Sequence, residues 1–81
     1  MNTVASIWSW SLPTPGFTTV EVFDVQGRRV RTLYSGNLSS GFNEIAWDFQ
    51  DDGGGRVARG VYFYRFKAPG VSGVRKIQVT R

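Results

Sequence analysis

The sequence predicts an all-β domain, an antiparallel sandwich of six to seven short strands. Aromatic side chains stand at alternate positions in Tyr62, Tyr64 and Phe66, which is the period of a strand with one buried face. Turn-forming residues recur about every 8–12 residues, as they do in sandwiches and barrels. No window places apolar residues at a helical spacing, so we expect two packed sheets and no helix.

The first predicted strand covers residues 4–12. Trp8, Trp10 and Leu12 alternate with serines there, so the three apolar side chains share one face. Two prolines and a glycine in residues 13–16 then break the ladder and predict a turn.

The second strand is expected at residues 17–25, with Val20 and Val22 on one face and Glu21 and Phe23 on the other. A hairpin follows, and its Gly27 is expected in the left-handed region. The returning strand at residues 29–35 does not alternate cleanly, because its apolar residues stand at irregular intervals, and this predicts a β-bulge. Residues 36–41 read as a polar loop.

The fourth strand is expected at residues 42–49, where Ile45 and Trp47 share one face and Trp47 belongs to the core. The glycine-rich connection 51–56 follows, and a seventh strand is expected only if residues 56–59 pair separately.

The aromatic strand at residues 61–67 comes after a glycine corner, and its Tyr62 and Tyr64 point inward. A buried tyrosine hydroxyl needs a partner, so one of the two is expected to clamp a neighbouring loop. After a turn at residues 69–73 comes the last strand, residues 74–80. Its inward positions are Ile77 and Val79, and its outward positions are Lys76, Gln78 and Thr80.

Composition limits the chemistry of the chain. Its 81 residues make one domain, 1–81, and there is no Cys and no His. A disulfide framework, a Ser-His-Asp triad and a His-bearing zinc site are therefore impossible. We expect a domain that is not an enzyme and that holds no cofactor and no metal.

The formal net charge is +4, and the eight arginines are spread over several strands. A dispersed pattern favours a solvated basic surface over a nucleic-acid site. The sequence contains no run of about 20 apolar residues, so it predicts no transmembrane helix.

Four ordered motifs carry a family resemblance. They are residues 22–30 (Val-Phe-Asp-Val-Gln-Gly-Arg-Arg-Val), Gly41 through Trp47-Asp48, residues 60–66 (Gly-Val-Tyr-Phe-Tyr-Arg-Phe) and residues 75–81 (Arg-Lys-Ile-Gln-Val-Thr-Arg). The set resembles the C-terminal Ig-like sorting domains of the type IX secretion system, and it is similar to the Ig-like domain of the flagellar hook-capping protein. Members usually carry a Pro-Asn-Pro-Phe-like stretch before the first strand, and Met1-Asn-Thr-Val stands there instead.

The resemblance implies an Ig-like or fibronectin-III-like sandwich that serves as the C-terminal module of a longer secreted protein. Its partners would be the outer-membrane secretion machinery and an upstream cargo domain such as a hydrolase or adhesin. The localisation implied is secreted, or on the surface of a Gram-negative, Bacteroidota-like bacterium, and we expect a monomer. Arg75, Lys76 and Arg81 are the residues implied for contact with the machinery. The alternative is an ordinary charged edge strand that resists strand addition.

Two other kinds of site are weighed. Asp48, Asp51 and Asp52 beside the three glycines would suit Ca²⁺, although the spacing is not that of an EF-hand, and a plain turn is favoured.

Trp8 and Trp10, with Tyr34 or Tyr62, would suit a sugar-stacking platform, as in an accessory carbohydrate-binding module of a secreted polysaccharide-degrading enzyme. The alternating pattern favours core positions for both tryptophans. A third function class is a self-assembling structural role like that of the hook-cap domain.

Overall fold

A computed structural model describes residues 6–80 of the chain. Those residues form six strands and no helix. The strands are β1 (Ser6–Leu12), β2 (Gly16–Asp24), β3 (Arg29–Leu38), β4 (Gly41–Trp47), β5 (Gly60–Ala68) and β6 (Val71–Val79).

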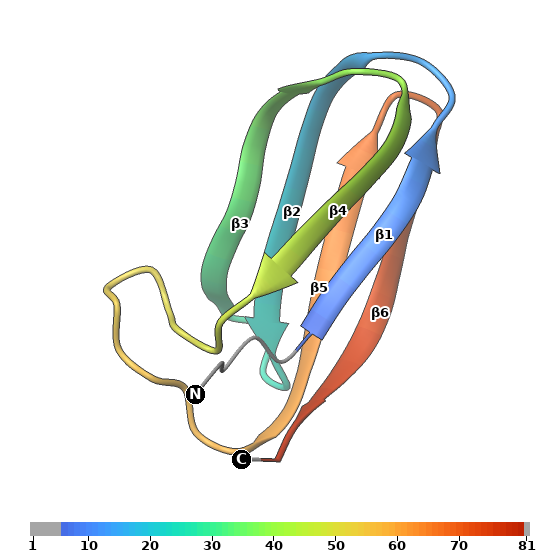
Figure 1. Ribbon diagram of the computed structural model, residues 1–81. Helices are drawn as coiled ribbons and strands as arrows, with labels where there is room; N and C mark the ends of the chain where they lie inside the picture. Colours follow the sequence, from blue (N-terminus) through green and yellow to red (C-terminus); the bar gives the residue numbers. More distant parts are fainter. Residues whose placement is uncertain (1–5, 81) are drawn as a thin grey trace.

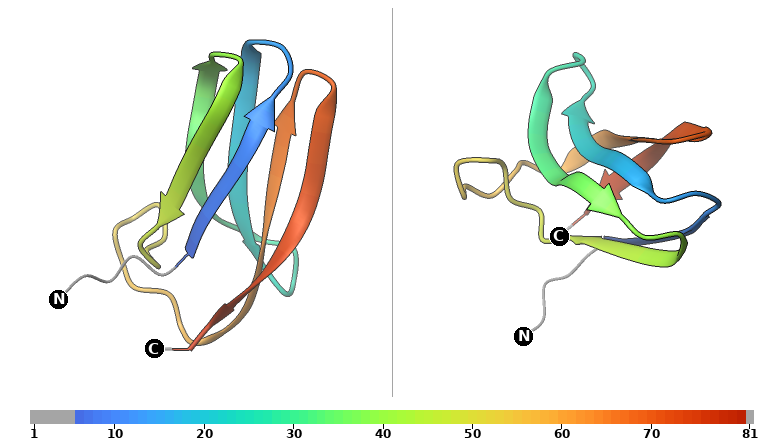
Figure 2. Two further views of the ribbon diagram at one scale, coloured as in Figure 1. Left: turned by 45° about the vertical axis from the view of Figure 1, so that its right-hand side comes forward. Right: turned by 90° about the horizontal axis from the view of Figure 1, so that it is seen from above.

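The strands make two layers (Figures 1 and 2). The larger sheet has the order β3-β2-β5-β6, and the ribbon β1-β4 covers one of its faces. Every pairing is antiparallel, so the predicted all-β sandwich is confirmed. The seventh strand is not formed within residues 6–80. Residues 56–59 contribute a single bridge, from Arg56 to Gln50.

The core lies between the two layers and follows the predicted alternation. Val20 and Val22 of β2 and Tyr62, Tyr64 and Phe66 of β5 are all buried on the face that meets the ribbon. Burying a large aromatic side chain removes about 150–250 Å² from water, so the β5 residues account for much of the stability of so small a domain. The other members of the cluster are Trp47, Phe49, Ile77 and Val79.

Strand β3 contains the predicted irregularity. Its register with β2 shifts between Val20 and Glu21 and again between Val22 and Phe23. Leu33 and Val30 are the extra residues at those two shifts, because their neighbours alone have partners on β2. Both partly buried side chains pack against the core, which explains why the apolar residues of this segment do not alternate.

Three predicted limits are wrong. Residues 36–38 belong to β3 and not to a loop, since pairing with Gly16 to Thr18 holds them extended although Gly36 and Asn37 are residues of low strand propensity. The fourth strand ends at Trp47, because Phe49 turns the chain with a φ of 66° while its ring stays in the core. A left-handed φ at a bulky residue is uncommon, and it redirects the chain into the following loop.

The last turn is also tighter than predicted. Only Pro69 and Gly70 separate β5 from β6, and Gly70 has the left-handed φ of 74°. Gly73, which the sequence predicts to lie in this turn, lies inside β6. A Cβ there would stand 2.9 Å from the ring of Phe66, so the glycine makes room for that ring.

The hairpin between β2 and β3 has the predicted glycine. Gly27 has a φ of 83°, and its N–H donates to the Asp24 carbonyl over 3.0 Å. The first strand begins at Ser6 where the structure describes it; positions 4 and 5 of the prediction lie outside the described residues.

Candidate functional site

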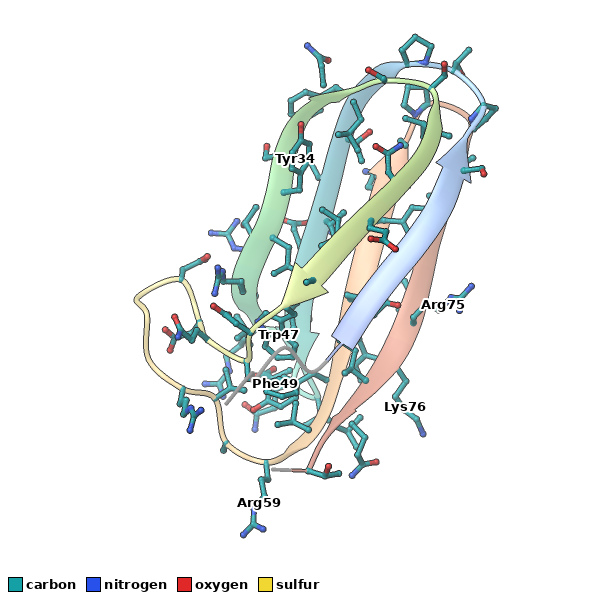
Figure 3. All side chains as sticks on the ribbon, in the orientation of Figure 1. Tyr34, Trp47, Phe49, Arg59, Arg75 and Lys76 are labelled. Carbon is teal, nitrogen blue, oxygen red and sulfur yellow. The ribbon has the colours of Figure 1, made fainter. Side chains whose placement is uncertain are left out.

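The candidate site is β6, the last strand of the larger sheet. It pairs with β5 on one side, and within residues 6–80 it has no strand neighbour on the other. Arg75 and Lys76 lie near its centre, both exposed, and both project from the strand in Figure 3. The structure therefore brings two of the three predicted recognition residues to an open sheet edge, and Arg81 lies outside the described residues.

Arg75 and Lys76 occupy opposite faces of β6. Arg75 is level with Tyr64, which is buried against the core, whereas Lys76 is level with Phe63 on the outer face. Successive side chains of a strand alternate in this way. A partner that contacts both cations must therefore reach around the edge of the sheet.

On the inner side, Arg75 lies close enough to Tyr64 to influence its ionisation. Burial raises the pKa of the Tyr64 hydroxyl, and the positive charge of Arg75 opposes that shift. The guanidinium thus stands at the rim of the core, where the ribbon does not bury it.

The outer side of the strand carries an apolar surface that the sequence patterns had not singled out. We define the outer patch as Phe23, Val25, Phe63, Arg65 and Val74, which line one shallow hollow with Asp24 and Gly27. Val25 and Val74 are 68% and 63% exposed, and the Arg65 guanidinium lies 4.9 Å from the centre of the Phe23 ring. Lys76 neighbours this patch across from Phe63. The signal was present, since Phe63 stands between two inward tyrosines and must face outward.

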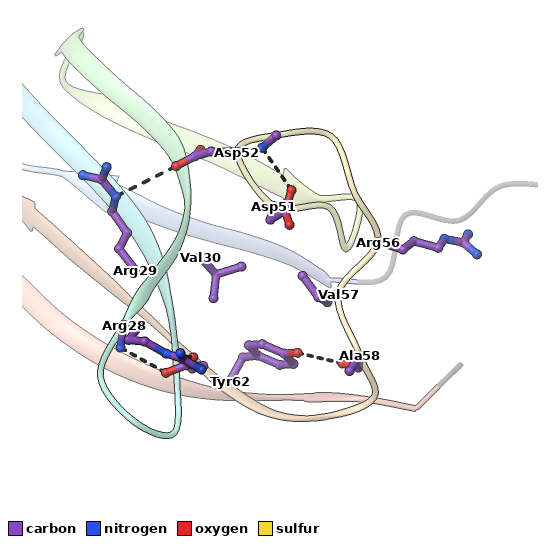
Figure 4. A pocket seen from close by; sticks show the side chains of 11 residues that line it. Arg28, Arg29, Val30, Asp51, Asp52, Arg56, Val57, Ala58 and Tyr62 are labelled. Carbon is purple, nitrogen blue, oxygen red and sulfur yellow. Dashed lines mark hydrogen bonds and ion pairs between the residues drawn. The ribbon is translucent and has the colours of Figure 1, made fainter.

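A second hollow shares Asp24 with the first and lies beside the loop that precedes β5 (Figure 4). It has a volume of about 580 Å³ and is lined by Arg28, Arg29, Asp51, Asp52 and Tyr62 among others. Several of its polar groups already have partners. The Tyr62 hydroxyl donates to the Ala58 carbonyl over 2.7 Å, which is the predicted tyrosine clamp on a loop. The hollow offers structural contacts and no nucleophile paired with a base.

The three aspartates weighed as a calcium site each accept hydrogen bonds from other parts of the protein. Asp48 accepts from Arg31 over 3.0 Å, Asp51 accepts from the backbone N–H groups of a turn, and Asp52 accepts from the Thr32 N–H. No group of three or more His, Cys, Asp or Glu able to hold a metal ion occurs in the part of the chain that the structure describes. The carboxylates therefore organise the 48–57 loop.

The sugar-platform residues are only partly placed. Trp8 and Trp10 lie on β1 paired with Ile45 and Asn43, but their side chains fall outside the described residues. Tyr62 is buried with its hydroxyl engaged, so it is not available for stacking. Tyr34 is half-buried and donates to the Asn37 carbonyl over 2.8 Å.

Comparison with known proteins agrees with this architecture. A search of curated proteins gives no match. Residues 6–80 contain no helix with the length and hydrophobicity needed to span a membrane. The family model of the FlgD Ig-like domain matches residues 8–73, which takes in all of β1 to β5 but the first two residues of β1, together with the start of β6. This confirms the Ig-like part of the resemblance seen in the motifs. The chain therefore belongs to the FlgD Ig-like domain family.

Proposed function

We propose that this domain is a non-catalytic sorting and attachment module. It would direct an upstream cargo protein across the outer membrane of a Bacteroidota-like bacterium by type IX secretion. The cargo would then be attached to the cell surface or released into the medium. The observation that carries the proposal is the position of β6. The strand that bears Arg75 and Lys76 lies at an open edge of the larger sheet, where secretion machinery can reach it.

The rest of the molecule suits a carrier. A module that is only recognised needs a stable fold, an accessible edge and no reacting groups. The core is built from packed aromatic and branched side chains without a disulfide, and the hollows at the surface are shallow. In this proposal the cargo carries the biochemical activity, and this domain carries the secretion signal.

The experiment is a secretion assay on folded variants. A periplasm-exported fluorescent reporter is fused to residues 1–81 and expressed in a bacterium that has type IX secretion. Removing the last strand would not separate recognition from folding, because Ile77 and Val79 belong to the core. The informative variant is therefore the double substitution Arg75→Glu and Lys76→Glu, since both side chains are exposed.

The matched control is Arg56→Glu with Arg59→Glu, which changes the net charge equally at two exposed loop arginines. We expect the parent fusion and the control to reach the surface or medium, and the β6 variant to stay in the periplasm while keeping its melting curve. Retention of the parent fusion itself would contradict the proposal. Equal export of the parent fusion, the β6 variant and the control would show that Arg75 and Lys76 are not needed for recognition.

The runner-up is an accessory carbohydrate-binding module of a secreted polysaccharide-degrading enzyme. If the parent fusion is retained inside the cell, a pull-down on insoluble polysaccharides decides for or against it. Binding that is lost in Trp8→Ala with Trp10→Ala, in a variant that keeps the melting curve of the parent domain, would establish the carbohydrate function.

A further inference from the structure

Strand β6 has the backbone geometry of a strand acceptor. All nine of its residues pair with β5 in unbroken register, from Gly60 opposite Val79 to Ala68 opposite Val71. It contains no proline, and no bulge twists it away from its sheet. The backbone N–H and C=O groups along its unpaired edge therefore form an ordered row of donors and acceptors. Alternate residues of an added strand would pair with them and extend the sheet.

A second copy of the chain is a poor occupant of this edge. Full antiparallel overlap of two β6 strands, residues 71–79 against residues 79–71, places Arg75 directly opposite itself. Each Lys76 would lie one position away from that pair, so the seam would hold four positive charges and no negative one. Like charges in cross-strand positions destabilise a ladder.

The same charges favour an acidic strand. Arg75 and Lys76 are consecutive and face opposite sides, so two consecutive acidic residues on an added strand would each meet one cation. Val74 is 63% exposed on the outer patch and would contact an apolar side chain of that strand. The other strands lack this pattern: β1 has no charged residue, and β4 carries only the acidic Glu44.

We propose that β6 accepts an extended acidic segment of a partner protein by strand addition. The segment has two adjacent Asp or Glu residues opposite Arg75 and Lys76, flanked by residues of high strand propensity. The inference rests on the proposed function for the identity of the partner, because it describes the segment by which the secretion machinery would bind β6. Its test measures binding in vitro and does not depend on secretion.

The probe is a capped nine-residue peptide of alternating Thr and Val with two adjacent Glu at its centre. Two comparison peptides replace the Glu pair with two Lys or with two Pro. Each is titrated into the isotope-labelled 81-residue domain at low salt, and backbone amide exchange and chemical-shift changes are followed by NMR. Low salt is used because the Debye length shortens to about 10 Å at 0.1 M salt, which weakens the attraction between exposed charges.

We expect the Glu peptide to protect β6 amides from exchange and to shift their resonances. The Lys peptide should bind about tenfold more weakly, since two attractive cross-strand pairs become repulsive. The Pro peptide should give no protection, because it cannot complete the backbone ladder. Arg75→Glu with Lys76→Glu should reverse the preference toward the Lys peptide, whereas Arg56→Glu with Arg59→Glu should leave it unchanged.

Several outcomes would overturn the inference. These are no binding by any peptide, equal binding of the Glu and Pro peptides, protection at β1, β3 or β4 in place of β6, or an unchanged preference in the β6 variant. The two proposals fail separately. Strand addition without export of the reporter would contradict the sorting function and support the strand-acceptor role of β6. Export without strand addition would support the sorting function and contradict the strand-acceptor role.

Discussion

The two edge strands of the four-stranded sheet, β3 and β6, differ in how far other parts of the chain cover them. At the β3 edge, the 48–57 loop folds back along the strand, and the Asp52 N–H donates to the Val30 carbonyl over 3.0 Å. The Asp52 carboxylate also accepts from the Thr32 N–H over 3.0 Å, and two register shifts distort this strand. The β6 edge has neither a covering loop nor a shift among the described residues. The β3 edge is covered from Val30 to Thr32, whereas the β6 edge is open to strand addition among the described residues.

The loop at the β3 edge is anchored to the core by a tryptophan. Trp47 is 1% exposed, stacks edge-on with Phe49 and Tyr62, and donates from Nε1 to the Gln50 carbonyl over 3.0 Å. Arg31 donates to the same carbonyl and to Asp48. The cover of β3 therefore depends on one large side chain and a few hydrogen bonds, and each can be removed separately.

The largest expected effect comes from Trp47→Ala. The substitution removes a fully buried indole and its hydrogen bond, and it should lower the free energy of unfolding by about 4 kcal/mol. Chemical denaturation measures this loss. Hydrogen exchange should show that amides of residues 50–57 and of β3 lose protection before the rest of the sheet.

The matched control is Tyr64→Ala, a buried aromatic on the β6 side of the core. It should cost about 3 kcal/mol but leave the loop amides protected relative to the global stability. A loss below about 1 kcal/mol would show that Tyr64 is not a core residue. If both variants expose the β3 edge equally, the anchoring role of Trp47 is wrong.

A smaller effect is expected from Asp52→Ala. The change removes the side-chain acceptor for the Thr32 N–H at a partly exposed position, so the loss should be about 0.5–1 kcal/mol. Faster exchange of the Thr32 amide would locate it. Asp52→Asn keeps an acceptor oxygen and should lose less than half as much, because the ion pair with Arg29 is long at 3.9 Å and exposed. Equal losses in the two variants would assign the effect to charge.

The smallest effect is a pH dependence at the β2–β3 turn. The Arg28 backbone N–H, the largest cause, and the Arg28 side chain and Gln26 N–H hold the pKa of Asp24 below its usual 3.8. A lowered pKa in the folded state adds stability above the unfolded pKa, and that stability is lost as the pH falls through the folded value.

Asp24→Asn should therefore destabilise the domain at neutral pH and match the parent progressively better below about pH 4. Urea midpoints measured between about pH 7 and about pH 2 test this expectation. A constant gap between parent and variant across that range would contradict it. The matched control is Asp51→Asn, whose carboxylate caps a turn in the 48–57 loop.

Local patterns in the sequence were enough to predict the core but not the edges. Alternation placed Tyr62, Tyr64, Ile77 and Val79 inward because the strand period is a property of the backbone alone. The irregular spacing in residues 29–35 was also a reliable sign of a bulge. Both signals act within one strand.

The features that were missed depend on contacts between distant segments. Gly73 resembles a turn residue until Phe66 is placed over it, and residues 36–38 resemble a loop until β2 pairs with them. The left-handed Phe49 has no sequence signature, because its conformation is stabilised by burial of its ring. The candidate site followed the same rule: the positions of Arg75 and Lys76 on opposite faces follow from alternation, but the openness of their edge required the topology.

The single neighbour of β6 also sets how the domain responds to mechanical force. A pull applied at Thr80 loads the pair Gly60–Val79 first, and the antiparallel ladder then opens one pair at a time toward Ala68–Val71. Unzipping of this kind needs far less force than shearing all nine pairs together. The strand proposed for recognition is therefore also the one that force applied at its end would peel away, while β2 and β5 stay paired behind it.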